Sequence, residues 1–315
     1  MTLRAPAITD IEAARVRIAG AAIRTPLVRL AEHGLDREIW LKLETLQPVG
    51  SFKLRGACNR IRAAAPDTLE GGVYTASAGN MAQGVAWMAR ALGLPARVFV
   101  PDHAPEAKIA AIRALGAGVE KISFDAWWEI MIAGGKQGEP GCFVHPVCDT
   151  EVMAGNGTIG LEIAEDLAGF DAVIVPFGGG GLVSGIAAAL RAKAPGAEVF
   201  ACEVEGAAPL AAALAAGRPT PIEFHRSFVD GIGSAAVLPA MWPIVRDLVA
   251  GSIVVPVAAV EAAIRQLIAR LHLIAEGAGA TPLAAALTER FRGRRVVCIL
   301  SGSSINFAEV ARIMA

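Results

Sequence analysis

Cysteine, aromatic side chains and long apolar runs are scarce in this chain of 315 residues. The five cysteines are scattered and form no CxxC pair, so reduced thiols in a cytoplasmic protein are predicted rather than a disulfide framework. No uninterrupted apolar run reaches the ~20 residues that a membrane helix needs, and the N-terminus has no apolar signal core. The net charge is only −1, which argues against a nucleic-acid partner. What remains is a chain long enough to bury one large core or two linked ones, with neither membrane nor nucleic acid as partner.

Strand-like and helix-like segments alternate along the chain, which indicates parallel sheets with right-handed crossovers. Two α/β units are predicted, a larger one from residues 1–65 and 146–315 and a smaller one from residues 66–145. The predicted helices cover residues 8–22, 51–65, 81–92, 105–115, 126–134, 158–168, 183–194, 207–216, 257–271, 282–290 and 307–314. The predicted strands cover residues 39–43, 72–76, 96–100, 119–122, 172–175, 199–203, 252–255 and 295–300.

A lysine opens one of these helices. Residues 47–57 read Gln-Pro-Val-Gly-Ser-Phe-Lys-Leu-Arg-Gly-Ala, so Lys53 follows a Pro/Gly turn and a serine, Ser51, suited to cap the helix. The helix dipole disfavours a cation at this end. If Lys53 is also desolvated, its pKa is lowered and the neutral amine can form a Schiff base. A surface lysine that starts an ordinary amphipathic helix is the alternative at this point.

A second candidate site is residues 77–84, Ser-Ala-Gly-Asn-Met-Ala-Gln-Gly, where a predicted strand ends and a helix begins. Open parallel sheets bind ligands outside the carboxyl ends of their strands. Outward-facing backbone N–H groups at such a turn would bind a carboxylate. A well-capped turn between strand and helix explains the same residues equally well.

Four consecutive glycines, from Gly178 to Gly181, follow the apolar strand at 172–175. Four glycines are entropically costly to order, so a merely structural turn rarely contains them. Without Cβ atoms, their N–H groups can close around a phosphate at a helix N-terminus. A dinucleotide fingerprint fits only in part, because Val183 stands where its third glycine would be. A single compact phosphate is therefore favoured.

A third loop at a strand end, residues 299–304, reads Ile-Leu-Ser-Gly-Ser-Ser. A neutral serine there, Ser301, could hydrogen-bond a ring nitrogen without protonating it. A cap for the final helix is the alternative.

Together, these segments occur in the order found in one family. The chain resembles the pyridoxal-phosphate (PLP) enzymes of the threonine/serine dehydratase and serine racemase group, which have the tryptophan-synthase-β fold, fold type II. Residues 24–27, 145–146, 155–160 and 230–231 also look like segments of this family, and the resemblance covers nearly the whole length. It implies two open twisted α/β domains, the larger binding PLP and the smaller binding the substrate, with the cofactor in the cleft between them. It further implies a homodimer or higher homo-oligomer.

The resemblance also assigns roles to individual residues. Lys53 would be the Schiff-base lysine and general base, and Ser77 would be a second catalytic residue. The cofactor-binding residues would be Phe52, Lys53, Asn80, Gly178, Gly179, Gly180, Gly181, Leu182, Gly231 and Ser301. The substrate-binding residues would be Ser77, Ala78, Gly79, Asn80, Met81 and Trp128.

The activity that this resemblance implies is deaminating β-elimination. A β-hydroxy-L-amino acid, such as threonine, serine or phenylserine, would give a 2-keto acid and ammonia. Hydroxyectoine-utilisation-type or hydroxyaspartate dehydratase activity, serine racemisation and β-replacement are the alternatives. Racemisation needs a second acid/base on the opposite face of the cofactor, and the racemase motif has serine where this chain has Ala78.

Two further departures from the family pattern bear on substrate and metal. Most relatives have histidine in place of Met81, and those that accept hydroxyaspartate have arginine near Trp128. Both changes favour an apolar or aromatic substituent on the substrate. Glu203 matches one ligand of the metal site of some relatives, but Pro209 stands where a second carboxylate should be. No metal dependence is therefore expected.

Overall fold

The computed structural model describes residues 3–31 and 34–315. Its larger sheet has six strands in the order β1-β2-β10-β7-β8-β9. β1 pairs antiparallel with β2, and all other neighbours in the sheet are parallel. The bounds are β1 Leu27–Arg29, β2 Glu38–Leu43, β7 Ala172–Pro176, β8 Glu198–Val204, β9 Gly251–Val255 and β10 Arg295–Leu300.

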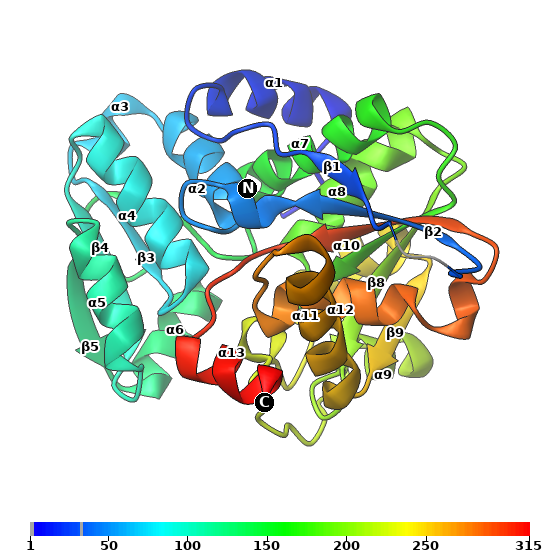
Figure 1. Cartoon of the computed structure of the whole chain (residues 1–315). Helices are drawn as coiled ribbons and strands as arrows, with labels where there is room; N and C mark the ends of the chain where they lie inside the picture. The colour runs from blue at the N-terminus through cyan, green and yellow to red at the C-terminus, as the bar shows by residue number, and fades with distance from the viewer. Residues whose placement is uncertain (1–2, 32–33) are drawn as a thin grey trace.

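The smaller sheet has four parallel strands in the order β5-β4-β3-β6. Its strands are β3 Val73–Ala76, β4 Ala96–Pro101, β5 Gly118–Ile122 and β6 Cys142–Phe143. All four fall within the range 66–145 predicted for the smaller unit. This sheet and its helices form the left-hand part of the molecule in Figure 1. The prediction of an α/β fold with two sheets is confirmed, whereas the exact domain boundaries stay a prediction.

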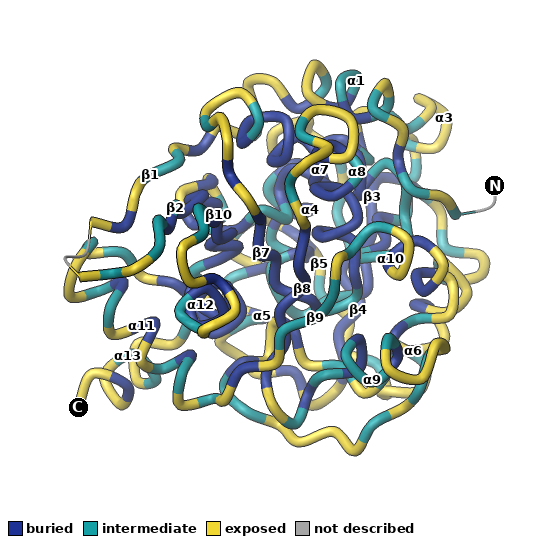
Figure 2. Tube along the Cα trace, turned by 90° about the vertical axis from the view of Figure 1, so that its right-hand side faces the viewer, coloured by how far each residue is buried: buried dark blue, intermediate teal, exposed yellow. Residues whose placement is uncertain are grey.

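Helices cover both faces of the larger sheet, and successive side chains along its buried strands point alternately into the two cores that these helices form. Ile174 packs in the core with α11 and α12, whereas Val173 and Val175 pack in the core with α7 and α8. Figure 2 shows α7, α8 and α12 buried along most of their length. The helices are α1 Ile8–Ile18, α2 Lys53–Arg62, α3 Pro66–Leu69, α4 Asn80–Leu92, α5 Glu106–Ala114, α6 Phe124–Ala133, α7 Thr150–Asp166, α8 Gly181–Lys193, α9 Pro209–Ala216, α10 Trp242–Leu248, α11 Val257–Leu271, α12 Gly277–Ala286 and α13 Phe307–Met314.

The helix predicted at 158–168 begins eight residues earlier, at Thr150, so this prediction is wrong at its N-terminus. The Asp149 side chain caps it by accepting hydrogen bonds from two backbone N–H groups. Gly155 and Gly157 lie inside the helix, at points where neighbouring backbones pass very close. A Cβ atom at Gly155 would lie 2.5 Å from the Arg55 carbonyl oxygen, and one at Gly157 would lie 2.8 Å from the Gly185 carbonyl oxygen. These glycines therefore allow α7 to pack tightly against α2 and α8.

The helix predicted at 282–290 is also displaced. It is α12, which runs from Gly277 to Ala286 with Pro282 inside it. Proline usually marks a helix start or stop, but tertiary packing overrides this preference here because all ten residues of α12 are buried. Two short helices, α3 and α10, were not predicted.

A buried cluster of charges anchors α2. The Arg55 side chain contacts Glu44 at 2.8 Å and Glu162 at 2.6 Å, and Lys42 contacts Glu162 at 2.6 Å. Arg55, Lys42 and Glu44 have no exposed surface. The cluster joins α2 to α7 and to the end of β2, and so fixes the helix that Lys53 begins.

Among residues 3–31 and 34–315, no helix combines the length and the apolar character needed to cross a bilayer.

Candidate active site

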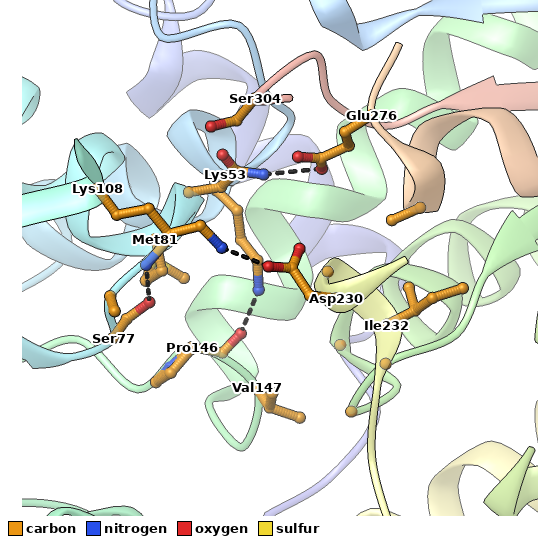
Figure 3. Close-up of a pocket in the computed structure, with 18 of the residues that line it drawn as sticks. Lys53, Ser77, Met81, Lys108, Pro146, Val147, Asp230, Ile232, Glu276 and Ser304 are labelled. Carbon is orange, nitrogen blue, oxygen red and sulfur yellow. Dashed lines mark hydrogen bonds and ion pairs between the residues drawn. The ribbon is translucent and has the colours of Figure 1, made fainter. Parts of the chain in front are cut away.

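A cavity of about 410 Å³ lies between the two sheets, where β3, β7 and β10 end. Every residue predicted to bind cofactor or substrate lines it, with the exception of Trp128. The three strands end at one place because they belong to parallel sheets whose carboxyl ends face the cavity. Figure 3 shows Lys53, Lys108, Asp230 and Glu276 directed into this space.

The loop before Lys53, which includes residues 50–52, packs against the loop that follows β10. Ser51 forms a β-bridge with Gly302, and the Phe52 N–H donates to the Ser301 carbonyl oxygen at 3.0 Å. Gly50 turns the chain with φ +66°, a conformation in which a side chain would be strained. Ser51 does not stand at the cap position, which Phe52 occupies, but its hydroxyl accepts a hydrogen bond from the Lys53 N–H at 3.3 Å. Two loops about 250 residues apart are thus joined at the site.

The Lys53 amine lies in the cavity and not at the surface, which removes the alternative of an ordinary exposed lysine. It donates to the Pro146 carbonyl oxygen at 2.8 Å and lies 5.1 Å from the centre of the Phe52 ring. Burial lowers the pKa of the amine to about 8, and the charge of Glu276 opposes that shift in part. At pH 7 about a tenth of the amine is therefore unprotonated and nucleophilic.

His145 fixes the turn on which the lysine rests. Its Nδ1 accepts hydrogen bonds from the backbone N–H groups of Val147 and Cys148, at 3.0 and 2.9 Å. Its Nε2 lies 3.0 Å from the Met131 carbonyl oxygen, to which it donates as the protonated nitrogen of a neutral ring. Burial lowers the pKa of His145 to about 4, so the ring stays neutral and holds the turn.

The glycine loop, residues 178–181, lies at the start of α8, and neighbouring atoms leave no room for side chains on it. A Cβ atom at Gly179 would lie 2.4 Å from the Val147 side chain, and Gly180 has φ +98°. The first N–H groups of a helix have no partner within the helix. Backbone donors of this loop and of Leu182 are therefore available to an anion in the cavity.

A second set of backbone donors begins α4. The Ser77 hydroxyl accepts a hydrogen bond from the Gly79 N–H at 3.2 Å, which orders the turn and leaves the hydroxyl proton free to donate. The N–H groups of Asn80 and Met81 belong to the first turn of α4, which is thirteen residues long. This turn can accept a carboxylate.

Sequence reasoning assigned no role to four ionisable residues that line the cavity, His103, Lys108, Asp230 and Glu276. Glu276 precedes α12 and accepts a hydrogen bond from the Asn80 amide at 2.9 Å. At the mouth, Lys108 of α5 forms an ion pair of 2.6 Å with Asp230. No local motif marks Glu276 or Lys108; the fold brings them to the site, and only the 230–231 segment carried a signal.

The aromatic wall differs by one residue from the predicted one. Trp127 lines the cavity, whereas Trp128 lies outside it with 42% of its surface exposed and stacks on Phe124. Met81 lines the cavity and is otherwise buried in a core that α2 and α4 share.

The Glu203 carboxylate is hydrogen-bonded to neighbouring residues of the protein through both of its oxygens. Its carboxylate accepts hydrogen bonds from the N–H groups of Leu210 and Ala211, both at 2.8 Å, and from the Ser252 hydroxyl at 2.6 Å. Over residues 3–31 and 34–315, no three His, Cys, Asp or Glu side chains gather in a way that could hold a metal ion. Metal independence stays a prediction.

Comparison with known proteins identifies the family and the fold. A family model described as "Pyridoxal-phosphate dependent enzyme" matches residues 18–302. The chain belongs to this family. It is 37% identical to the L-threonine ammonia-lyase of Thermotoga maritima over 98% of this chain and 78% of that protein. It is 38% identical to the L-threonine ammonia-lyase of Geobacter sulfurreducens over 97% of this chain and 77% of that protein.

Solved structures of this family superpose closely. Maize serine racemase has a TM-score of 0.90 and 31% identity, covering 98% of this chain and 97% of its own. The processed form of threonine deaminase isoform 2 from Solanum lycopersicum has a TM-score of 0.87 and 32% identity, covering 99% of this chain and 90% of its own. The resemblance read from the sequence motifs is thereby confirmed, as are fold type II and the cofactor, PLP.

The cavity fits PLP on its own chemistry. The glycine loop offers N–H groups to a phosphate, and Lys53 offers a partly neutral amine to an aldehyde. Among the residues that the structure describes, the buried Oδ1 atom of Asn80 has no hydrogen-bond partner, which is costly unless a bound group supplies one. Lys53, the glycine loop and Ser301 would hold the cofactor.

Proposed function

We propose that this chain is a PLP-dependent ammonia-lyase that converts a β-hydroxy-L-amino acid to a 2-keto acid and ammonia. The observation that carries the proposal is the Lys53 amine, which is buried in the cavity with its pKa lowered to about 8. It lies in one cavity with a phosphate-sized glycine loop and a carboxylate-binding turn. Relatives named L-threonine ammonia-lyase and L-threonine dehydratase support the same activity.

The residues of the chain divide the work as follows. PLP, when bound, supplies the electron sink that stabilises negative charge at Cα. The Ser77 hydroxyl and the first N–H groups of α4 bind the substrate carboxylate and so orient the Cα–H bond. The Lys53 amine takes the Cα proton as general base. The β-hydroxyl leaves as water, and a water molecule enters when the amino group leaves as ammonia, so the net change is amino acid to keto acid plus ammonia.

We further propose that the β-substituent of the preferred substrate is apolar or aromatic. Trp127, Met131, Met81 and Ala104 form apolar parts of the wall. The cation at the mouth, Lys108, is already paired with Asp230 at 2.6 Å. A carboxylate on the substrate would have to compete with Asp230 for Lys108 or remain unpaired against the apolar wall, and a carboxylate buried without a partner costs several kcal/mol.

A substrate panel tests both parts of this proposal. With L-threonine, L-serine, phenylserine and 3-hydroxyaspartate, we expect kcat/KM for 3-hydroxyaspartate to lie at least about tenfold below that for threonine. Phenylserine should rank with or above threonine. Keto acid and ammonia are measured for each substrate. No keto acid from any member would overturn the activity, and 3-hydroxyaspartate as the best substrate would overturn only the specificity.

The neighbouring tryptophans give a matched pair of variants for this panel. Trp127→Ala should change the ratio of phenylserine to threonine, because Trp127 lines the cavity. Trp128→Ala removes a tryptophan outside the cavity and should leave the ratio unchanged. Equal effects of the two would contradict the assignment of Trp127 to the wall.

Racemisation is the second candidate, favoured by the similarity to maize serine racemase. The cavity has Ala78 where a second acid/base is required, so we expect little racemisation by the natural chain. Ala78→Ser should introduce racemisation of serine, detected by chiral chromatography, without abolishing dehydration. Ala104→Ser, elsewhere in the wall, is the control. An unchanged product profile in Ala78→Ser, with cofactor still bound, would contradict the argument from Ala78.

A further inference from the structure

Glu276 faces the cavity from the start of α12, where glycines of two neighbouring segments leave room for its carboxylate. A Cβ atom at Gly302 would lie 2.6 Å from the Glu276 carboxylate, and one at Gly231 would lie 3.5 Å from it. The Glu276 N–H donates to the Gly302 carbonyl oxygen at 3.0 Å, which fixes the residue at this loop. The carboxyl group is therefore held at one point, between the loop after β10 and the segment at 230–231.

The contact with Asn80 determines how the amide of that residue is turned. A carboxylate only accepts hydrogen bonds, so the NH₂ end of the amide must face Glu276, as the Nδ2 to Oε1 distance of 2.9 Å shows. The other end, Oδ1, is buried and has no hydrogen-bond partner within residues 3–31 and 34–315. A flipped amide would place two acceptor oxygens against each other. Figure 3 shows Glu276 at the upper edge of the cavity.

Several charges face the carboxyl group from different elements. Burial and the negative charge of Asp230 raise the pKa of Glu276 to about 7, while hydrogen bonds from Asn80 and the Ser304 N–H and the charge of Lys108 oppose that shift. Lys53 faces it from α2, and Glu276 in turn raises the pKa of that amine. The charge of Glu276 therefore changes within the neutral range.

We propose that Glu276 is a positioning residue whose ionised form locks the Asn80 amide in one orientation toward the PLP ring, and whose protonation releases it. A neutral carboxyl can donate as well as accept, so it accommodates either end of the amide. The orientation of Asn80 decides whether the phenolic oxygen of the ring meets a donor or an acceptor. The protonation state of that oxygen, and with it the visible spectrum of the bound cofactor, should follow the charge of Glu276. This proposal rests on PLP binding beside Asn80 and not on the identity of the substrate.

A spectroscopic titration of the holoenzyme without substrate tests it. The visible spectrum of the unaltered protein should change with a midpoint within about one unit of pH 7. Glu276→Gln keeps an acceptor for Asn80 but cannot ionise, so this midpoint should disappear. Asp230→Asn removes a negative neighbour and should lower the midpoint by about 0.5 unit or more, because a like charge disfavours ionisation.

A purely structural role for Glu276 would not produce this pattern. A spectrum without a midpoint near neutrality, or a midpoint that persists in Glu276→Gln, would overturn the proposal. If Glu276→Gln does not fold, an unshifted or raised midpoint in Asp230→Asn would overturn it instead. Because no substrate is present, the outcome is separate from that of the substrate panel.

Discussion

Replacing Lys53 with alanine should lower the rate of keto-acid release by about 10³-fold or more while the fold persists. The loss follows because the variant has neither the amine that binds the cofactor nor the base that takes the Cα proton. The fold should persist because Lys53 makes one hydrogen bond to a backbone carbonyl and belongs to none of the hydrophobic cores. Initial rates and thermal unfolding, both measured with added PLP, check the two parts.

Lys121→Ala is the control for this variant. Lys121 is exposed and paired with Glu106 at 3.3 Å, and surface pairs of this kind contribute ~0–1 kcal/mol. Its activity and stability should remain near those of the unaltered protein. Ammonia release by Lys53→Ala at a rate close to the original would contradict the assignment of the lysine.

Replacing Arg55 with methionine should lower the free energy of unfolding by about 3–5 kcal/mol. Arg55 is fully buried between Glu44 and Glu162. Its removal leaves the negative charges of these two buried carboxylates with less positive charge to balance them. Burying an unpaired charge costs far more than an exposed pair contributes. Because α2 also carries Lys53, cofactor retention should weaken as well. Chemical denaturation at pH 7 measures the difference in the free energy of unfolding between this variant and the unaltered protein.

The control is Arg15→Met, which breaks an exposed pair with Glu165 and should cost less than about 1 kcal/mol. The pH dependence adds a second check. Burial alone would raise the pKa of Glu44, but the charge and hydrogen bonds of Arg55 outweigh it and lower the pKa below the ordinary 4.5. The stability from this pair is thus complete above pH 4.5 and is lost as the pH falls through the lowered value. In Arg55→Met the unpaired Glu44 is relieved by protonation, so the stability gap should narrow toward pH 4. Equal costs for the two arginines would contradict this account.

The residues predicted to bind the cofactor come together in one cavity, and their signals could be read because they are local and lie at strand ends. Pro and Gly before Lys53, four glycines after β7 and serines after β10 each mark a loop, and parallel strands bring such loops together. The alternation of strands and helices is equally local. These features can be predicted without knowing which side chains contact one another.

What the sequence did not predict depends on contacts between distant segments. The start of α7 was misplaced because its glycines, which have low helix propensity, serve close backbone packing against α2 and α8. Trp127 rather than Trp128 lines the cavity because the orientation of α6 decides which of two adjacent side chains faces inward. Glu276 meets Asn80 across 196 positions, and no local pattern indicates such a contact.

Reduction of the PLP-loaded protein with borohydride, followed by peptide mapping, tests the central claim most directly. Reduction fixes the cofactor on the lysine that holds it, and mass spectrometry identifies that residue. The structure predicts the modification on Lys53, since this amine lies in the cavity with a pKa of about 8. Modification of another lysine, or none in protein that carries PLP, would contradict the account.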